Sequence, residues 1–294
     1  MHAHTHGREG NRRRMAWALG INLTLLVAGV AGALAFNSVA LLADAGHVLS
    51  DVAAIGVGLV AAQMARRPAG GRRTFGSGRT EILGALANGI ALVAVAALVV
   101  FEAARRLGEP PDVEGLGVLV IGVAGLAGNL AATWVLAGGD RGDVNLEGVL
   151  RHSAADALGS LGVVVAGVLV LTTGWREADP IVGILIGLLI LLGSWRLLSE
   201  PFDVLMEAAP KGIDVTEVGD AMAAVAGVRE VHDLHVWTVT SGFPALAAHV
   251  ISDPREDPDE VRGRLEALLG ERFGIEHTTL QTMPVRLLDL EDRR

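Results

Sequence analysis

The chain has 294 residues, of which 51% are hydrophobic, and its mean hydropathy is +0.46. This composition is too apolar for an ordinary soluble domain and is typical of a protein that crosses a membrane several times. The absence of cysteine excludes disulfides and zinc–thiolate sites, so a metal ion would have to be held by His, Asp or Glu. The net charge is −9, and residues 201–294 carry eighteen acidic and nine basic side chains, which argues against nucleic-acid binding.

Six mostly apolar stretches are long enough to cross a bilayer, which takes about 20 helical residues. The predicted spans are Met15–Phe36, Val39–Ala65, Ile82–Leu107, Gly115–Gly138, Glu147–Thr173 and Pro180–Leu198. The sixth span has the shortest uncharged core, so its ends are the least defined. We expect residues 1–14, which include three histidines, to be a disordered leader, residues 15–200 to form the membrane domain, and residues 201–294 to form a cytoplasmic domain.

The arginines predict the orientation of the spans. With a cytoplasmic N-terminus, the segments next to the spans place nine arginines on the inner side and three on the outer side: Arg12, Arg13, Arg14, Arg66, Arg67, Arg72, Arg73, Arg79 and Arg141 against Arg105, Arg106 and Arg176, of which the pair Arg105–Arg106 is an exception to the rule. An excess of basic residues in cytoplasmic loops is the general rule. We therefore expect a multi-pass protein of the cell (inner) membrane with both termini in the cytoplasm.

Two His-x-x-x-Asp pairs lie inside the apolar spans, one in the second and one in the fifth. They are His47 with Asp51, and His152 with Asp156. Residues four apart share one face of a helix, so each pair offers a nitrogen and an oxygen to the same point. Two such helices facing each other would supply the tetrahedral set that suits Zn²⁺, with Cd²⁺ or Co²⁺ as other candidates. Ionisable groups at membrane depth are costly and are functional by default. Asp44, three residues before His47 and near the outer end of its span, either lines the exit path of the ion or faces water, and we favour the second interpretation.

The charges of these four side chains suggest exchange of metal for protons. Two neutral imidazoles and two carboxylates become neutral overall with one divalent cation, and equally with two protons. A site that is neutral with either the cation or the protons bound could open first to one side of the membrane and then to the other without moving net charge through the bilayer. Because neutral imidazole is the form that binds metal, acid should release the ion.

The acidic tail has the pattern of a small α+β domain. Its predicted elements are helices at Asp214–Val225 and Asp257–Phe273 and strands at Val231–Val239, Ala245–Ile251 and Thr278–Leu287. The order αββαβ favours helices on one face of an antiparallel or mixed sheet.

Three tail histidines, His232, His249 and His277, are the candidates for a second metal site. On a regular strand His232 and His235 would point to opposite faces, so one site is not expected to use both. We interpret His235 as structural. The alternative for each candidate is an ordinary packed or surface histidine.

Four stretches resemble the cation diffusion facilitator family. They are Asn37–His47 (NSVALLADAGH) followed by Asp51, Phe75–Leu83 (FGSGRTEIL), His152–Ser160 (HSAADALGS) and His232–Trp237 (HDLHVW). The resemblance implies a six-helix transporter that exports zinc or related ions by proton antiport. It also implies a homodimer whose ferredoxin-like tails bind regulatory metal, and the His/Asp pairs resemble the zinc-type subgroup.

The sequence departs from the family pattern in two places. Residues 64–80 contain no His, Asp, Glu or Cys, so a metal site known in the corresponding loop of some relatives is expected to be absent. Gln281 is followed by Thr282 and Met283, where many relatives have an acidic residue two positions after the Gln.

Two other functions are compatible with the same residues. One is an intramembrane metalloenzyme, since bound zinc can activate water. Four protein ligands would leave no open position, however, and there is no His-Glu-x-x-His motif, so we expect no enzyme. The other is a metal sensor that acts through its tail without ion flux.

Overall fold

The computed structural model describes the backbone of residues 3–65, 70–137 and 144–284, but not the side chains of residues 3–16, 18, 54, 55, 58, 59, 61, 62, 65 and 135–155. The chain forms two compact units, which are described separately. One contains Met1–Val57 and Ala87–Leu197, and the other contains Gly58–Leu86 and Leu198–Arg294.

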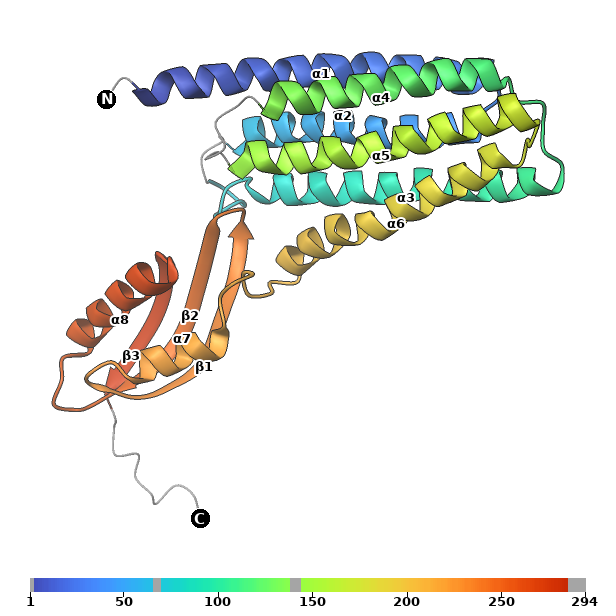
Figure 1. Cartoon of the computed structure of the whole chain (residues 1–294). Coiled ribbons are helices and arrows are strands. Elements are labelled where there is room, and N and C mark those ends of the chain that lie inside the picture. Colours follow the sequence, from blue (N-terminus) through green and yellow to red (C-terminus); the bar gives the residue numbers. More distant parts are fainter. Residues whose placement is uncertain (1–2, 66–69, 138–143, 285–294) are drawn as a thin grey trace. The chain divides into compact units, whose positions relative to one another are not determined.

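Six long helices dominate the chain and run side by side (Figure 1). They are α1 (Ala3–Ala35), α2 (Val39–Ala65), α3 (Arg79–Gly108), α4 (Gly115–Ala137), α5 (Val144–Thr173) and α6 (Ala178–Leu205). Among the described residues, four apolar stretches are long enough to span a membrane, in α3, α4, α5 and α6. The apolar stretch described in α1, Leu19–Ala35, is shorter.

The helices follow the predicted spans, with the largest differences at two ends. Helix α2 has the predicted bounds, whereas α1 begins at Ala3, where a disordered leader was expected. That leader contains no proline to stop a helix and several arginines, which are good helix formers. Helix α6 continues through Pro201 to Leu205, although the missing proline N–H removes one backbone hydrogen bond.

Glycines let α4 and α5 approach each other closely. A Cβ on Gly167 of α5 would lie 2.8 Å from the backbone nitrogen of Leu119, and one on Gly122 of α4 would lie 3.1 Å from that of Val164. Small residues at such contacts allow helices to pack in a membrane, where the hydrophobic effect does not drive their association. The α4–α5 pair is therefore held by direct backbone contact, and this fixes the path of the helix that carries Asp156.

This contact predicts a difference between two glycine substitutions. We expect Gly167→Ala to destabilise the membrane domain by about 1–3 kcal/mol, because the backbone of α4 would have to shift. Gly193→Ala in α6 is the matched control, since nothing lies within 4 Å of its added Cβ and alanine favours a helix. Thermal unfolding of the two purified variants in detergent tests this expectation, and equal melting temperatures would contradict it.

Helix α2 is anchored to α6 at its first turn. The buried carboxylate of Asp179, in α6, accepts hydrogen bonds from the Ser38 hydroxyl and from the backbone nitrogens of Val39 (2.7 Å) and Ala40 (3.4 Å). The sequence, in which Asp179 stands just before a proline, suggests instead a cap on its own helix. The carboxylate satisfies the first N–H groups of α2, which have no partner within that helix.

The second unit contains a small α+β fold made of α7 (Val215–Ala223), β1 (Val228–Thr240), β2 (Phe243–Ser252), α8 (Pro258–Phe273) and β3 (His277–Pro284). The sheet has the order β1-β2-β3, with β1 and β2 antiparallel and β2 and β3 parallel, so the predicted αββαβ order and mixed sheet are confirmed. Asp214 and Asp257 cap the two helices through their side chains, as aspartate commonly does.

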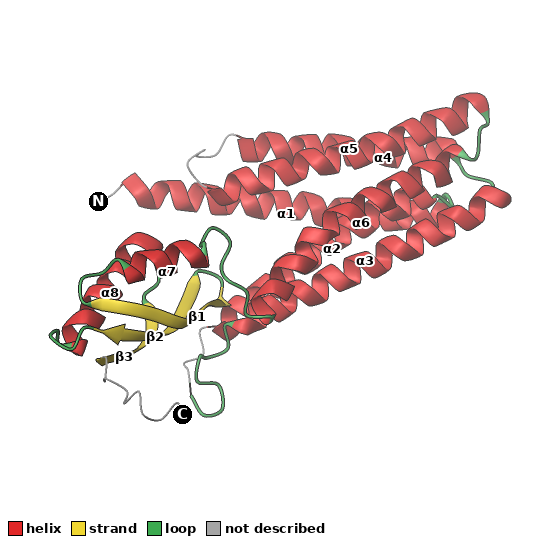
Figure 2. Cartoon of the chain, turned by 90° about the horizontal axis from the view of Figure 1, so that it is seen from below, coloured by secondary structure: helices red, strands yellow, loops and turns green. Residues whose placement is uncertain are grey.

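Both helices of this fold cover the same face of the sheet (Figure 2). The core between them and the strands is formed by buried apolar side chains, among them Met222 of α7, Leu265 and Leu269 of α8, and Leu246 and Val250 of β2. The side chains that alternate with these along the strands lie on the opposite face.

A bulge at Asp233 changes the faces of the β1 residues. The register pairs His232 with His249 and His235 with Ala247, so three steps along β1 oppose two along β2. Asp233 has a φ of 53°, in the left-handed region, and is the extra residue. Because directly paired residues share a face, His232 and His235 lie on the same face. The prediction that they point apart is wrong, since it assumed a regular strand.

Candidate metal-binding site

Helices α2 and α5 bring three of the four predicted transport ligands together. His47 and Asp51 are one turn apart on α2, and Asp156 lies on α5. The Nε2 atom of His47 is 3.0 Å from Oδ1 of Asp156, a hydrogen-bond distance. One donor atom from each of the three side chains lies within 4.8 Å of the others. The fourth residue, His152, precedes Asp156 by one turn of α5, and its side chain lies outside the described residues.

The spacing of these donors is close to what a zinc ion requires. Zinc binds nitrogen and oxygen at about 2.0–2.2 Å, so two donors of a regular tetrahedron stand about 3.3 Å apart. The 3.0 Å between Nε2 of His47 and Oδ1 of Asp156 is close to this value, and no two of the three donors are more than 4.8 Å apart. A nitrogen together with carboxylate oxygens suits borderline metals such as Zn²⁺ and Co²⁺ better than Mg²⁺ or Ca²⁺.

Asp156 is the most deeply placed of the three. It is 5% exposed, whereas 26% of the His47 side chain is exposed. An ionised carboxylate at such a position must have a positive partner or a proton, because desolvation disfavours the free charge. The contact places Nε2 of His47 against this carboxylate, and which of the two atoms carries the proton depends on the tautomer of the ring.

A second polar group lies one turn away along the same two helices. Asp44 precedes His47 by three residues on α2, and Ser160 follows Asp156 by four on α5. The Ser160 hydroxyl is 3.3 Å from Oδ2 of Asp44 and receives a hydrogen bond of 3.1 Å from the amide of Asn129 on α4. Helices α2, α5 and α4 thus contribute one side chain each to this group.

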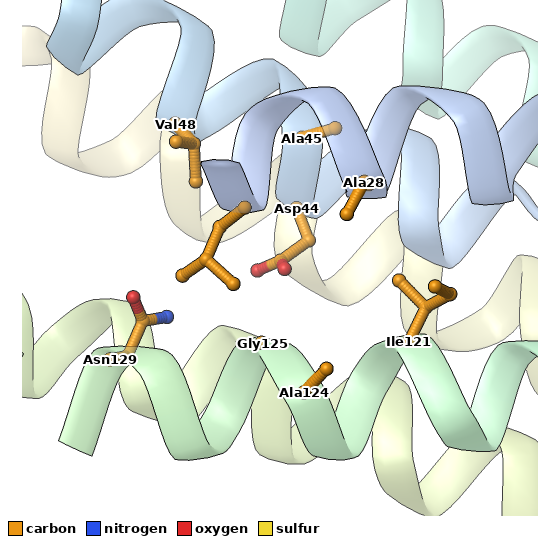
Figure 3. A pocket seen from close by; sticks show the side chains of 10 residues that line it. Ala28, Asp44, Ala45, Val48, Ile121, Ala124, Gly125 and Asn129 are labelled. Carbon is orange, nitrogen blue, oxygen red and sulfur yellow. The ribbon is translucent and has the colours of Figure 1, made fainter. Parts of the chain in front are cut away.

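Asp44 also points into a cavity between α1, α2 and α4 (Figure 3). The cavity has a volume of about 20 Å³, which is room for about one water molecule. Its other lining residues are mostly apolar. The interpretation of Asp44 as a water-facing residue is therefore wrong. The signal was available in its spacing, because a residue three positions before His47 lies on the same helix face.

The arginine pair that departs from the expected orientation has a local partner. Glu102, near the end of α3, forms ion pairs with Arg105 (3.0 Å) and Arg106 (2.8 Å). Arg106 also donates to the backbone oxygen of Asn37, just before α2. One carboxylate thus offsets part of the positive charge at this end of the helix.

The tail histidines do not form one cluster within the described chain. The rings of His232 and His249 are 5.4 Å apart, on the face of the sheet away from the helices. His277 is paired with Ala245 on β2, four residues from His249, and its ring packs against Phe243 at 5.3 Å. Four residues of strand separate positions by about 13 Å. The predicted grouping of all three is therefore wrong, because it did not include the register of β2 and β3.

The chain matches two families along most of its length. Residues 15–206 match the family described as "Cation efflux transmembrane domain", and residues 210–285 match "Cation efflux protein, cytoplasmic domain". Among solved structures it is similar to the "Metal-bound C-terminal domain of the CzcD transporter", at 39% identity, with a TM-score of 0.24, over 24% of this chain and 99% of that one.

Three relatives match over most of their length and of this chain. The "Metal cation efflux system protein CzcD" of Cupriavidus metallidurans is 39% identical over 95% of this chain and 89% of that protein. The "Zinc transporter ZitB" of Escherichia coli is 38% identical over 95% of this chain and 91% of its own. The "Cadmium, cobalt and zinc/H(+)-K(+) antiporter" of Bacillus subtilis is 34% identical over the same shares. These are transporters rather than enzymes, and with its apolar helices and its αββαβ tail the chain belongs to the cation efflux family, also called the cation diffusion facilitators.

Proposed function

We propose that this chain exports Zn²⁺ from the cytosol in exchange for protons, with His47, Asp51, His152 and Asp156 as the transport ligands. The observation that carries the proposal is the convergence of donors from α2 and α5 at one buried point. Zinc is the ion that best suits two imidazoles and two carboxylates, and Cd²⁺ and Co²⁺ share enough of its chemistry to compete. The zinc, cadmium and cobalt named for the relatives support this choice.

Exchange with protons follows from the shared atoms of His47 and Asp156. A cation bound by Nε2 and Oδ1 would replace the hydrogen bond between them, and a proton returning to the pair would restore it. With two neutral imidazoles and two carboxylates, the site is neutral with one divalent cation or with two protons. Movement of the loaded site between the two membrane faces then carries no net charge, and this suits alternating access.

The path of the ion beyond the site includes Asp44. Its carboxylate, the Ser160 hydroxyl and the Asn129 amide offer polar atoms one turn nearer the end of the bundle where α2 begins. Oxygen donors of this kind bind zinc less tightly than a set that includes imidazole. They can therefore receive the ion from the transport site without trapping it.

Orientation and assembly complete the proposal. We infer that both termini are cytoplasmic, because of the arginine distribution, and that two copies associate through their cytoplasmic domains. His232 and His249 are the remaining candidates for a regulatory metal in that domain. Two imidazoles are fewer than the four ligands of a structural zinc site, so this pair alone would not complete one. The transport proposal does not use these two histidines.

Flux into sealed proteoliposomes tests both parts of the proposal. With the lumen more acidic than the outside, protons leave and zinc should accumulate, which an internal zinc dye would report. An internal pH dye should show alkalinisation on addition of zinc, and a protonophore should slow the uptake. Zinc flux that ignores the pH gradient would refute the antiport, and the absence of flux from folded protein would favour a sensor.

A further inference from the structure

An open cavity of about 850 Å³ lies entirely within the second unit, apart from the transport ligands. One wall is the loop that joins α2 to α3, with Arg72, Arg73 and Arg79. The opposite wall is formed by β1, where Trp237 lines the cavity, and by Glu207 just after α6. The cavity is therefore made by segments far apart in the sequence and has a volume within the range of ligand sites.

The cavity carries an excess of positive charge. Arg79 is occupied, because it pairs with Glu207 at 3.2 Å and donates to the backbone oxygen of Val239. Arg73 donates to the Ser77 hydroxyl at 3.1 Å, and within the described residues no carboxylate forms an ion pair with Arg72 or Arg73. Among the described residues, these two guanidinium groups therefore add positive charge to the cavity without a carboxylate beside them. Guanidinium groups are well suited to bind phosphate through paired hydrogen bonds.

The sequence places these arginines at the membrane surface. Arg79 is the first residue of α3, an apolar helix long enough to span the bilayer, so Arg72 and Arg73 stand only a few residues before it. Phe75 of the same loop is 51% exposed, and Trp237 contributes a second aromatic ring to the cavity. Aromatic rings are favoured at the level of lipid headgroups. Basic pockets beside membrane helices bind anionic headgroups, and the cytoplasmic leaflet is rich in them.

We infer that this cavity binds the phosphate of an anionic phospholipid headgroup through Arg72 and Arg73. A soluble phosphate has the same chemistry at its oxygens, but a lipid is already concentrated next to the loop. The apolar part of the lining, which includes Phe75 and Leu234, suits the glycerol and the first methylenes of a lipid. The inference rests on the membrane location of α3 and on the proposed cytoplasmic side of this loop, but on neither the identity of the ion nor its exchange for protons.

Lipid titration of the full-length protein in detergent, followed by native mass spectrometry, tests the inference. We expect phosphatidylglycerol to bind more tightly than phosphatidylcholine, and the preference to fall by about 10–30-fold in Arg72→Gln/Arg73→Gln. The matched control is Arg255→Gln/Arg262→Gln, which removes the same charge from the cytoplasmic fold outside the cavity and should keep the preference. Thermal unfolding of both variants checks that they are folded.

Three outcomes would overturn the inference. The first is an unchanged lipid preference in the folded cavity variant, and the second is an equal loss in the control, which would indicate a general effect of charge. The third comes from calorimetry with inorganic phosphate and glycerol 3-phosphate. Tight binding of either, without a preference for phosphatidylglycerol, would assign the cavity to a soluble anion. Zinc flux in proteoliposomes of phosphatidylcholine alone is a separate measurement, so failure here leaves the proposed transport intact.

Discussion

Asp156→Ala is expected to abolish zinc flux while leaving the fold intact. Asp156 contributes an oxygen to the group formed with His47 and Asp51, and it is only 5% exposed. Loss of a partner that merely orients a metal ligand costs 10–100-fold in affinity, so loss of a ligand should reduce zinc affinity by at least about 100-fold. The fold should tolerate the change, because the partner left behind, His47, is 26% exposed and can hydrogen-bond to water instead.

The measurement is zinc uptake into proteoliposomes, together with isothermal titration of zinc into the purified protein. Asp220→Ala is the matched control, since it removes an exposed carboxylate from α7 in the cytoplasmic fold. Both variants should elute and melt like the parent, and only Asp156→Ala should lose flux. Normal uptake by Asp156→Ala would show that this carboxylate is not a transport ligand.

His47→Asp is expected to change the ion that is carried. An additional carboxylate in place of the imidazole makes the site harder and more negative, which favours Mn²⁺ over Zn²⁺. The hydrogen bond between His47 and Asp156 would also be replaced by two carboxylates that repel each other in the absence of a cation or a proton. The ratio of manganese to zinc flux should therefore rise by at least about tenfold, a change of about 1.4 kcal/mol in relative affinity.

His47→Asn is the control for the shape of the new side chain. Asparagine has nearly the size of aspartate but no charge, so it should lose zinc transport without gaining manganese transport. Competition between the two ions in the same vesicles gives the ratio directly. If His47→Asp keeps the selectivity of the parent, the imidazole does not contact the transported ion.

The membrane part of the fold could be predicted because its rules are local. A bilayer requires helices of a certain length, and the bounds of α2, Val39–Ala65, are those that the apolar pattern predicts. The spacing of four residues places His47 and Asp51 on one helix face. The spacing within each helix does not show that α2 and α5 pack against each other. The structure shows that they do, and that Asp156 lies beside His47 and Asp51.

The remaining errors come from partners that are distant in sequence. Asp179 stands where it would cap its own helix, but its carboxylate is used by α2, about 140 residues earlier. His232 and His235 share a face of the sheet because Asp233 forms a β-bulge between them. The residues around Asp233 carry no sequence pattern that predicts this bulge. His277 is separated from His249 by the register of two parallel strands, which depends on the whole domain.

The buried carboxylate of Asp179 gives α6 a mechanical role. It holds the first turn of α2, two turns before His47 on the same helix. Any change in the tilt of α6 near Asp179 would therefore pull on that turn, so the geometry of the His47 and Asp51 donors depends on a carboxylate that never touches the ion.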